Sequence, residues 1–398
     1  MKYKLGDFCT FRYGKMPLKA KFSDNKDLYP IYSGYRTAGF YDEYNIEAGE
    51  LIVVARGVGG TGDVKLTPEK CYLTNLSIAV AVDENLALKK YLYYYFQTKN
   101  LRYLDSGSAQ SQITISDLQN VRLALPSIED QGVIVATLSA LDDKIDNNTK
   151  TNYSLEQIVQ AIFKSWFVDF EPFANEEFID SELGEIPAGW SVQTIEYLAD
   201  KVAMGPFGSN IKVETFVESG VPIISGNHLR GLYLGELGYN FITEEHARRL
   251  SNSLVRAGDI IFTHAGNIGQ VALIPDDCDY PYYVISQRQF YLRCDKTKAL
   301  PEYVNYFFHS HEGQGKLLAN ASQTGVPSIA RPSSHLKGIP IVLPPIEVQL
   351  KWFEAVRAML QSLNCYNKES KRLATVRDSL LAALRIEGKE NINFNWVR

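Results

Sequence analysis

The chain has 398 residues, of which 45% are apolar and 22% are charged, a balance that excludes a disordered or collagen-like polypeptide. At roughly 100–200 residues per domain, this length predicts two or three domains with sizeable cores. The net charge of −5 argues against a free-standing nucleic-acid binder, and apolar runs such as residues 51–55 are far shorter than the ~18 residues of a membrane span.

The cysteines and the N-terminal residues indicate the compartment. The five cysteines, at positions 9, 71, 278, 294 and 365, form no C-x-x-C pair. This spacing favours reduced thiols over a disulfide framework or a zinc site. Residues 1–7 lack the apolar segment of a secretory signal, so we expect a cytoplasmic protein.

The charge is distributed unevenly along the chain. Residues 1–126 carry a net charge of +3, residues 127–182 a net −9, residues 183–344 a net −2 and residues 345–398 a net +3. Most of the acidity therefore lies in one short stretch, and the other segments can still present local basic surfaces.

In chain order, the segments outside two long helices mix strands and short helices. Branched apolar residues bounded by Gly or Pro predict strands at 51–55, 76–82, 121–125, 260–263, 289–292 and 339–343. Segments with an aromatic face predict helices at 86–98 and 300–309. Segments rich in Gly, Ser, Asn and Gln predict loops at 57–62, 106–112, 205–210 and 319–328. The predicted fold class is α+β.

The two halves of the chain resemble each other at four short segments. The matching pairs, in the same order along both halves, are 29–34 with 221–226, 49–53 with 258–262, 88–96 with 300–308, and 125–131 with 343–349. The offset between partners is far longer than the period of a solenoid repeat. The chain is therefore predicted to be a duplicated unit, with a globular domain at 1–126, a helix and connector at 127–182, a second globular domain at 183–344, and a second helix and tail at 345–398.

Each globular domain is followed by a long helix with apolar residues in alternating three- and four-residue steps. The first helix is expected to begin near Ser127 and to end before Pro172, and the second to end at Gly388. The residues predicted to pack in the helical seam are Leu138, Leu141, Ile145, Asn148, Asn152, Leu155, Val159, Ile162, Leu360, Leu363, Asn367, Leu381 and Leu384.

The two seams also share polar residues near their centres. Asn148 and Asn152 interrupt the first seam, and Asn367 and Ser370 interrupt the second. Buried Asn at such positions fixes helix register at some cost in stability. The alternative is that each helix packs only on its own globular domain. Their uninterrupted length and matching polar positions favour a pair of antiparallel helices that pack on each other.

No catalytic centre is recognisable in the sequence. The G-x-G-x-x-G match at residues 57–62 is followed by strand-like residues and Pro68, whereas a dinucleotide site needs a helix there. The Pro-Pro pair at 344–345 lacks the flanking residues of a DNA methyltransferase motif. His309 and His311 have metal-like spacing but no accompanying ligand cluster, which favours surface residues. No nuclease signature and no Ser-His-Asp arrangement stand out.

Four motifs carry a resemblance to a known family. Residues 163–173 have the sequence FKSWFVDFEPF, and residues 184–190 have the sequence GEIPAGW. The segments LPSIEDQ at 125–131 and LPPIEVQ at 343–349 complete the set. Together they resemble the specificity subunits of Type I restriction–modification systems, over the whole chain and in the family's order of domains. The first copy departs from the pattern at Ser127, where the second copy has Pro345.

The resemblance implies a non-catalytic subunit that recognises double-stranded DNA. It implies two target-recognition domains, each of which reads one half of a split target, with the helices setting the unread gap. It also implies two modification subunits that carry S-adenosylmethionine and methylate adenine, and restriction subunits that use ATP and magnesium. No cofactor and no metal is expected on this chain. The acidic stretch at 127–182 would then be a face for partner subunits or a solvated face.

The residues predicted to contact DNA combine a suitable type, a loop context and rough equivalence between the two copies, since Arg and Lys suit guanine and Asn and Gln suit adenine. In the first domain they are Lys15, Lys19, Tyr32, Arg36, Arg56, Thr61, Gln110 and Gln112. In the second domain they are Ser209, Asn210, Lys212, Asn227, His228, Arg230, His264, Asn267, Gln323 and Arg331. The alternative function is a duplicated scaffold that assembles subunits without reading DNA sequence; an enzyme with an unrecognised site is a weaker alternative.

Overall fold

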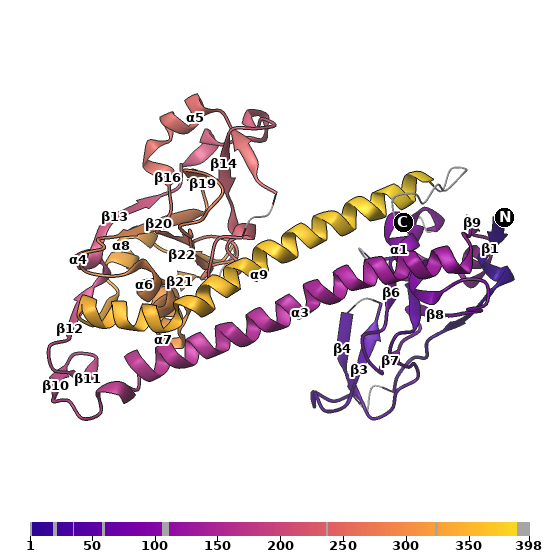
Figure 1. Ribbon diagram of the computed structural model, residues 1–398, viewed down its shortest axis with the longest axis horizontal. Coiled ribbons are helices and arrows are strands. Elements are labelled where there is room, and N and C mark those ends of the chain that lie inside the picture. Colours follow the sequence, from indigo (N-terminus) through magenta and orange to yellow (C-terminus); the bar gives the residue numbers. More distant parts are fainter. Residues whose placement is uncertain are drawn as a thin grey trace. The chain divides into compact units, whose positions relative to one another are not determined.

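The structure is a computed structural model that describes residues 2–18, 22–34, 36–57, 60–105, 111–235, 238–322 and 325–387. These residues form two compact units. The first unit comprises the described residues within Met1–Thr149 and Asn367–Arg398, and the second comprises those within Lys150–Tyr366. Each unit therefore contains one globular part and a portion of both long helices, which Figure 1 labels α3 and α9.

The first unit is built on two small sheets. One is antiparallel with the order β2-β8-β5-β6, and the other has the order β4-β3-β7 with β3 parallel to β7. The strands are β2 (Cys9–Tyr13), β3 (Tyr29–Ser33), β4 (Arg36–Tyr41), β5 (Leu51–Val54), β6 (Val64–Leu66), β7 (Tyr72–Leu73) and β8 (Ser77–Val82). A separate antiparallel pair joins β1 (Lys2–Lys4) to β9 (Arg122–Ala124).

The core of the first unit lies between the four-stranded sheet and its helices. The short helices are α1 (Lys89–Thr98) and α2 (Ile115–Gln119). Val53 and Ile78 of the sheet and Leu92 of α1 belong to one buried cluster with Leu138 of α3, and Leu381 of α9 packs against that cluster. The long helices are thus part of the globular core and not a separate attachment to it.

The second unit repeats this architecture with additions. Its sheets have the orders β13-β20-β17-β18 and β15-β14-β19-β16. The strands of these sheets are β13 (Ala199–Met204), β14 (Val221–Ile224), β15 (Asn240–Ile242), β16 (Leu254–Val255), β17 (Asp259–Thr263), β18 (Val271–Leu273), β19 (Tyr283–Ile285) and β20 (Gln289–Cys294). Three antiparallel pairs accompany them: β10 (Phe178–Ser181) with β11 (Gly184–Pro187), β12 (Ser191–Thr194) with β23 (Pro340–Leu343), and β21 (Ala321–Ser322) with β22 (Ser328–Ile329).

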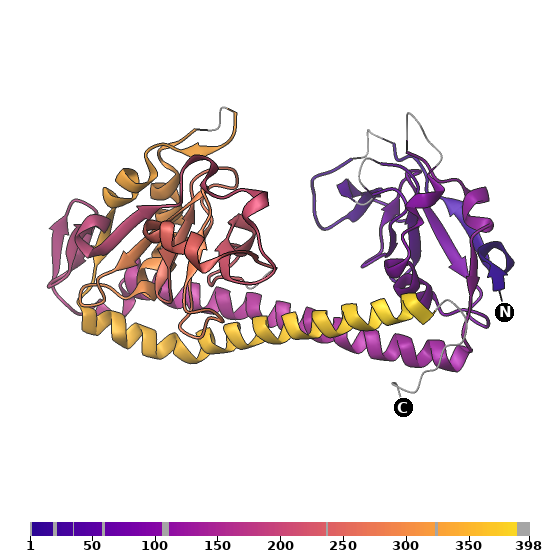
Figure 2. The ribbon, with the colours of Figure 1, turned by 90° about the horizontal axis from the view of Figure 1, so that it is seen from above.

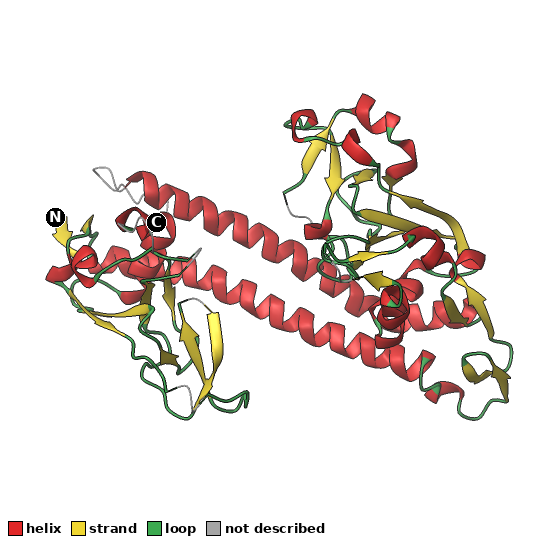
Figure 3. Cartoon of the chain, turned by 180° about the vertical axis from the view of Figure 1, so that it is seen from behind, coloured by secondary structure: helices red, strands yellow, loops and turns green. Residues whose placement is uncertain are grey.

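The helices of the second unit surround a larger aromatic core. They are α4 (Ile195–Leu198), α5 (Glu244–Arg249), α6 (Pro301–His309), α7 (His311–Leu318) and α8 (Pro332–Lys337). Phe163 and Phe167 of α3 contact Trp352 of α9, with ring centroids 5.6 Å apart in each pair. Phe167 also contacts Trp190, at a centroid distance of 6.0 Å. Figure 3 shows the strands of these sheets in yellow and the helices in red.

The duplication predicted from the sequence is present in the topology. Replacing β2, β8, β5 and β6 by β13, β20, β17 and β18 reproduces the order of the four-stranded sheet. The parallel pair β3–β7 likewise corresponds to the parallel pair β14–β19. All six predicted strands exist, as β5, β8, β9, β17, β20 and β23, and the two predicted short helices exist as α1 and α6. The predicted α+β class is therefore confirmed.

The long helices are α3 (Ile128–Phe167), of 40 residues, and α9 (Ile346–Glu387), of 42 residues. Within the first unit they are antiparallel, because Asp142 lies 2.9 Å from Arg377 while the later Asn148 lies 3.3 Å from the earlier Ser370. Within the second unit Asn152 donates to the Leu363 carbonyl at 3.4 Å. Figure 2 shows the α3 and α9 segments of each unit along one side of its globular part.

Most of the predicted seam residues lie between the helices or against a core. The fully buried ones are Leu138, Asn148, Asn152, Val159, Leu360 and Leu363, and the partly buried ones are Leu141, Ile145, Leu155, Ile162 and Leu381. Asn367 is exposed, unlike the seam position expected for it. At 100° per residue it is rotated by about 40° from Leu363, whereas Ser370 returns to the seam and contacts Asn148. The side chain of Leu384 and the expected stop at Gly388 lie outside the described residues.

The predicted segment boundaries at 126, 182 and 344 stay a prediction. Each compact unit contains part of both long helices, because the units reflect packing in space. The predicted segments were instead bounded by sequence motifs, so the two divisions of the chain differ.

Candidate nucleic-acid interface

In the first unit, several predicted DNA-contacting residues lie where strands of both sheets end. The backbone of Arg56, just after β5, pairs with Gln112 in an isolated bridge. The buried Ser77 hydroxyl donates to the carbonyl of Gly34, next to β3, at 3.2 Å. A Cβ on Gly34 would lie 3.4 Å from the Arg56 carbonyl, so the ends of β3 and β5 are adjacent. These contacts define the strand-end surface of the first unit.

Basic and amide side chains are available at this surface. Lys15 and Arg36 are exposed, and Arg36 pairs with Ser33 at the end of β3. Arg56 and Gln112 are half-buried. The buried Nε of Arg56 has no hydrogen-bond partner among the described residues, which leaves a donor for an incoming acceptor. The strand-end surface therefore offers cationic and amide donors from four separate segments.

Thr61 and Tyr32 of the first unit make contacts within the fold. Thr61 is only 1% exposed, and its hydroxyl donates to the Gly57 carbonyl at 2.9 Å. Its hydroxyl therefore holds its own loop, and its predicted contact with DNA stays a prediction. Tyr32 is half-buried in β3, and burial raises the pKa of its hydroxyl, with smaller contributions from Glu69 and Cys71. Lys19 and Gln110 lie outside the described residues.

In the second unit, the equivalent strand ends form a more extensive surface. His264, after β17, donates its backbone N–H to the Arg288 carbonyl and accepts from the N–H of Ile329. The next residue, Ala265, pairs with Ser328 in an isolated bridge. Asn267 is exposed in the turn that follows. We call the edge made by these segments the strand-end surface of the second unit.

A layer of polar side chains lies directly beneath this edge. Thr263 donates to Gln270 at 3.3 Å and accepts from the amide of Gln289 at 3.5 Å. Gln289 accepts in turn from Ser286. A Cβ on Gly226 would lie 3.0 Å from Oε1 of Gln270, so the turn after β14 also reaches this layer. Such a supporting network restricts the side chains above it, which favours a defined contact surface.

The histidines of the second unit differ in their roles. Burial lowers the pKa of His264, with backbone hydrogen bonds opposing the shift, so burial favours the neutral ring. His228 is 4% exposed, its Nδ1 lies 2.9 Å from the backbone N of Ser225, and its ring stacks on Tyr239 at 4.5 Å. The ring of His228 is packed in the interior, and its predicted contact with DNA stays a prediction.

The remaining predicted residues of the second unit are spread over the surface. Asn227 and Arg230 are exposed next to each other, with Nη2 of Arg230 3.2 Å from Oδ1 of Asn227. Arg331 is exposed at the start of α8 with a left-handed φ of 47°. Asn210 and Lys212 are exposed on a separate segment that contacts α5 through His246. The side chain of Ser209 and all of Gln323 lie outside the described residues.

Sequence reasoning missed Arg288. It is exposed, immediately precedes β20, and its Nη1 lies 3.3 Å from the position of a Cβ on Gly266. The residue in the same place in the first unit is Leu76, whose carbonyl likewise accepts from the residue after β5. Because the candidates were chosen partly by equivalence between the halves, this Arg was overlooked. The Gln-Arg-Gln sequence directly before a predicted strand could have revealed it.

The glycine-rich segment and the histidine pair, neither of which has a catalytic interpretation, can now be placed in the fold. The glycine-rich segment at 57–62 is followed by β6 and not by a helix, which fits the prediction that it is not a nucleotide site. His309 is half-buried at the end of α6, and burial lowers its pKa to about 4, whereas His311 is exposed at the surface as expected. Within the described ranges, no group of three or more His, Cys, Asp or Glu residues could hold a metal ion.

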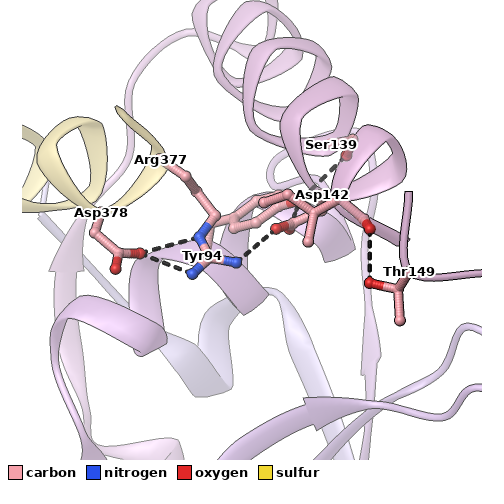
Figure 4. Close-up of polar contacts among 7 residues, drawn as sticks. Tyr94, Ser139, Asp142, Thr149, Arg377 and Asp378 are labelled. Atoms are coloured by element: carbon pink, nitrogen blue, oxygen red, sulfur yellow. Dashed lines mark hydrogen bonds and ion pairs between the residues drawn. The ribbon is translucent and has the colours of Figure 1, made fainter. Parts of the chain in front are cut away.

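Polar contacts also hold α3 and α9 to the globular part of the first unit. Figure 4 shows Asp142 of α3 between Tyr94 of α1 and Arg377 of α9. Tyr94 donates to Asp142 at 2.7 Å, and Arg377 lies 2.9 Å from the other carboxylate oxygen. Asn148 further donates to Glu369 at 2.8 Å. The helix pair of this unit is thus fixed by directional bonds as well as by apolar packing.

None of the helices in the described part of the chain combines the length and the apolarity that a membrane crossing requires.

Comparison with known proteins places these features in context. A family model described as the Type I restriction modification DNA specificity domain matches residues 1–157. The specificity subunit of the Type I restriction enzyme MjaIX from Methanocaldococcus jannaschii is 28% identical over 78% of this chain and 71% of its own length. The MjaVIII specificity subunit of the same organism is 23% identical over 98% of this chain and 93% of its own length.

A solved structure is similar over nearly the whole chain. The crystal structure of the Type I restriction–modification S subunit from M. genitalium aligns with 96% of this chain and 95% of its own, with a TM-score of 0.64 and 17% sequence identity. At this identity the likeness concerns the fold.

Proposed function

We propose that this chain, which belongs to the family of Type I restriction–modification specificity subunits, reads the DNA target for such a complex. Each unit presents its strand-end surface to one half of a bipartite target, and α3 and α9 together set the gap between the halves. The observation that carries this function is the duplication: two units with the same sheet order place different side chains at the same edge. Two related but unequal surfaces suit a split, asymmetric sequence.

The proposed complex supplies the chemistry that this chain lacks. We propose that two modification subunits bind S-adenosylmethionine and methylate adenine, and that restriction subunits with ATP and magnesium join them. This chain would act without its own cofactor or metal and would neither methylate nor cut DNA alone. The net charge of −5 is compatible with this division, because partner subunits can supply many of the phosphate contacts.

The test is to map methylated adenines in cells that express the chain with its modification subunits and in cells that lack it. We expect one bipartite motif whose methylation depends on this chain. The purified chain alone should transfer no methyl group to DNA. Methylation that depends on the chain but shows no sequence preference would instead support a scaffold that does not read DNA. Methylation that persists unchanged without the chain would contradict both functions.

A further inference from the structure

Two glutamines occupy identical positions in the duplicated units, one in the first turn of each long helix. Gln131 lies at the start of α3 and Gln349 at the start of α9, and the side chains of both are fully buried. Their backbone N–H groups donate to the carbonyls of residues 127 and 345 at the helix starts. The first turn of each helix therefore fixes the position of the backbone that carries the side chain. Neither has a partner on the strand-end surface.

The hydrogen bonds of the two side chains match one for one. Oε1 of Gln131 accepts from the N–H of Leu88 at 2.8 Å, and Oε1 of Gln349 accepts from the N–H of Leu300 at the same distance. Leu88 and Leu300 are the N-cap residues of α1 and α6, with the same φ of −72° and ψ of 133°. In both units the long helix therefore holds the N-terminus of the aromatic helix.

The donor side of each amide completes the match. Nε2 of Gln131 donates to the carbonyls of Leu86 and Pro126, both at 3.1 Å. Nε2 of Gln349 donates to the carbonyls of Lys298 at 3.2 Å and Pro344 at 2.9 Å. One side chain thus joins three backbone segments: the long helix, the aromatic helix and the strand that precedes the long helix. We call these two sets of bonds the glutamine ties.

The ties differ from the apolar contacts around them, and in the first unit they act together with the Tyr94–Asp142 hydrogen bond. Apolar packing of Ile134 and Leu138 on the first core attracts the helix but is not directional. Hydrogen bonds are directional and weaken steeply when their angle changes. The ties therefore fix the rotation of a globular part on its helix, which apolar contacts alone leave less well defined.

We infer that Gln131 and Gln349 are positioning residues that fix the angle at which each reading surface is presented, and so restrict the complex to one gap length. This inference rests on the proposed function. Each base pair of gap changes the facing direction of a half-site by about 35°, so a recognition domain that rotates on its helix can follow a neighbouring gap. Loosening either tie should widen the range of gaps without changing the half-sites.

The experiment uses the complete methyltransferase complex, with DNA in which the two native half-sites are separated by the native gap or by one or two base pairs more or fewer. The variants are Gln131→Leu and Gln349→Leu. The matched control is Gln160→Leu on the exposed face of α3. We expect the ratio of methylation at gaps changed by one base pair to methylation at the native gap to rise about tenfold in either variant and to stay unchanged in the control.

A second variant keeps the test decisive if the leucine variants do not fold. Gln131→Glu retains an acceptor for Leu88 but loses both donor bonds, and it should widen gap tolerance in the same direction. Variants that melt at lower temperature but keep the wild-type gap ratio would overturn the inference, because the ties would then be structural only. If the wild-type complex itself methylates no bipartite target, the proposed function fails first, and the inference falls with it.

Discussion

Both units have an arginine next to the four-stranded sheet at the strand-end surface, but beside different strands. Arg56 follows β5 in the first unit, whereas Arg288 precedes β20 in the second. The residue that corresponds to Arg56 in the second unit is Ala265, as their matching bridges to Gln112 and Ser328 show. The guanidinium groups of Arg56 and Arg288 therefore lie at different positions on the same scaffold. Because Arg suits guanine, we expect guanine to occur at different positions in the two half-sites.

Replacing Arg288 with alanine should alter sequence preference within one half-site. If Arg288 forms a bidentate contact with guanine, its loss should cost about 1–3 kcal/mol at one base position and relax specificity there. Methylation rates on targets with each base at each position would measure this. Lys212→Ala, at an exposed position away from that edge, is the comparison and should weaken binding uniformly across sequences. An unchanged preference in the Arg288 variant would contradict its assignment as a base contact.

His309 should make the second unit sensitive to acid. Burial lowers its pKa to about 4 in the folded chain, below the ordinary value of 6.5. Between these values the unfolded chain binds a proton that the folded chain does not, so stability falls as the pH drops from about 6.5 to 4, by up to ~3 kcal/mol. Thermal unfolding across this range should show the slope, and His309→Leu should reduce it. His311→Gln, at an exposed position, should leave the slope intact.

At the scale of elements, the long helices were the most predictable feature. Their apolar period and the Leu-Pro sequences before them placed the starts within a residue of Ile128 and Ile346. The end of α3 was less predictable, because it depends on tertiary packing. Val168 and Asp169 both donate their backbone N–H groups to the Lys164 carbonyl, and Phe170 then adopts a φ of 54°. A phenylalanine is tolerated in that conformation because its ring packs on Trp190, 5.4 Å away.

The candidate site was less predictable than the fold. Loop context identified Lys15, Arg36 and Asn267 as exposed residues, but composition could not separate them from Thr61 and His228, whose side chains face inward. Which polar residue of a loop points outward depends on bonds to distant segments, such as the stacking of His228 on Tyr239. Sequence spacing alone does not contain that information.

Lengthening both helices should lengthen the unread gap. One heptad inserted after Asn148 and one after Asn367 keep the seams in phase and add roughly 10 Å to each helix. At 3.4 Å per base pair, the gap should grow by a few base pairs at most, subject to a rotation of about 35° for each pair. Methylation mapping should show both half-sites unchanged. A folded insertion mutant that binds its partners and keeps the original gap would show that the helices do not set it.

At the scale of the whole molecule, the two reading functions should be separable. Replacing residues 1–126 with the corresponding domain of a relative should change one half of the methylated motif and leave the other half intact. The reason is that each unit has its own core and its own strand-end surface. Long-read mapping of methylated adenine measures both halves at once. A chimera that alters both halves would contradict independent recognition, whereas an unfolded chimera is recognised by its loss of partner binding.

The acidity of the chain also has a specific location. The connector at 168–187, which contains the β10–β11 hairpin, has seven carboxylates and no Lys or Arg, and all seven residues are exposed. Helix α3 itself carries only part of the acidic stretch expected at 127–182. Because phosphates repel such a segment, we expect the connector to face away from bound DNA.

The first unit is discontinuous in sequence, and this has a consequence for how the protein is made. Its core includes Leu138 of α3, against which Leu381 of α9 packs, so it cannot be complete until the ribosome has synthesised both segments. At about 5–20 residues per second, the delay between these two leucines is on the order of 10–50 s. During that time the second unit, which is continuous, can fold while the nascent first domain keeps an apolar face open. Premature termination would leave that face without its own helix, and chaperones or another chain would have to cover it.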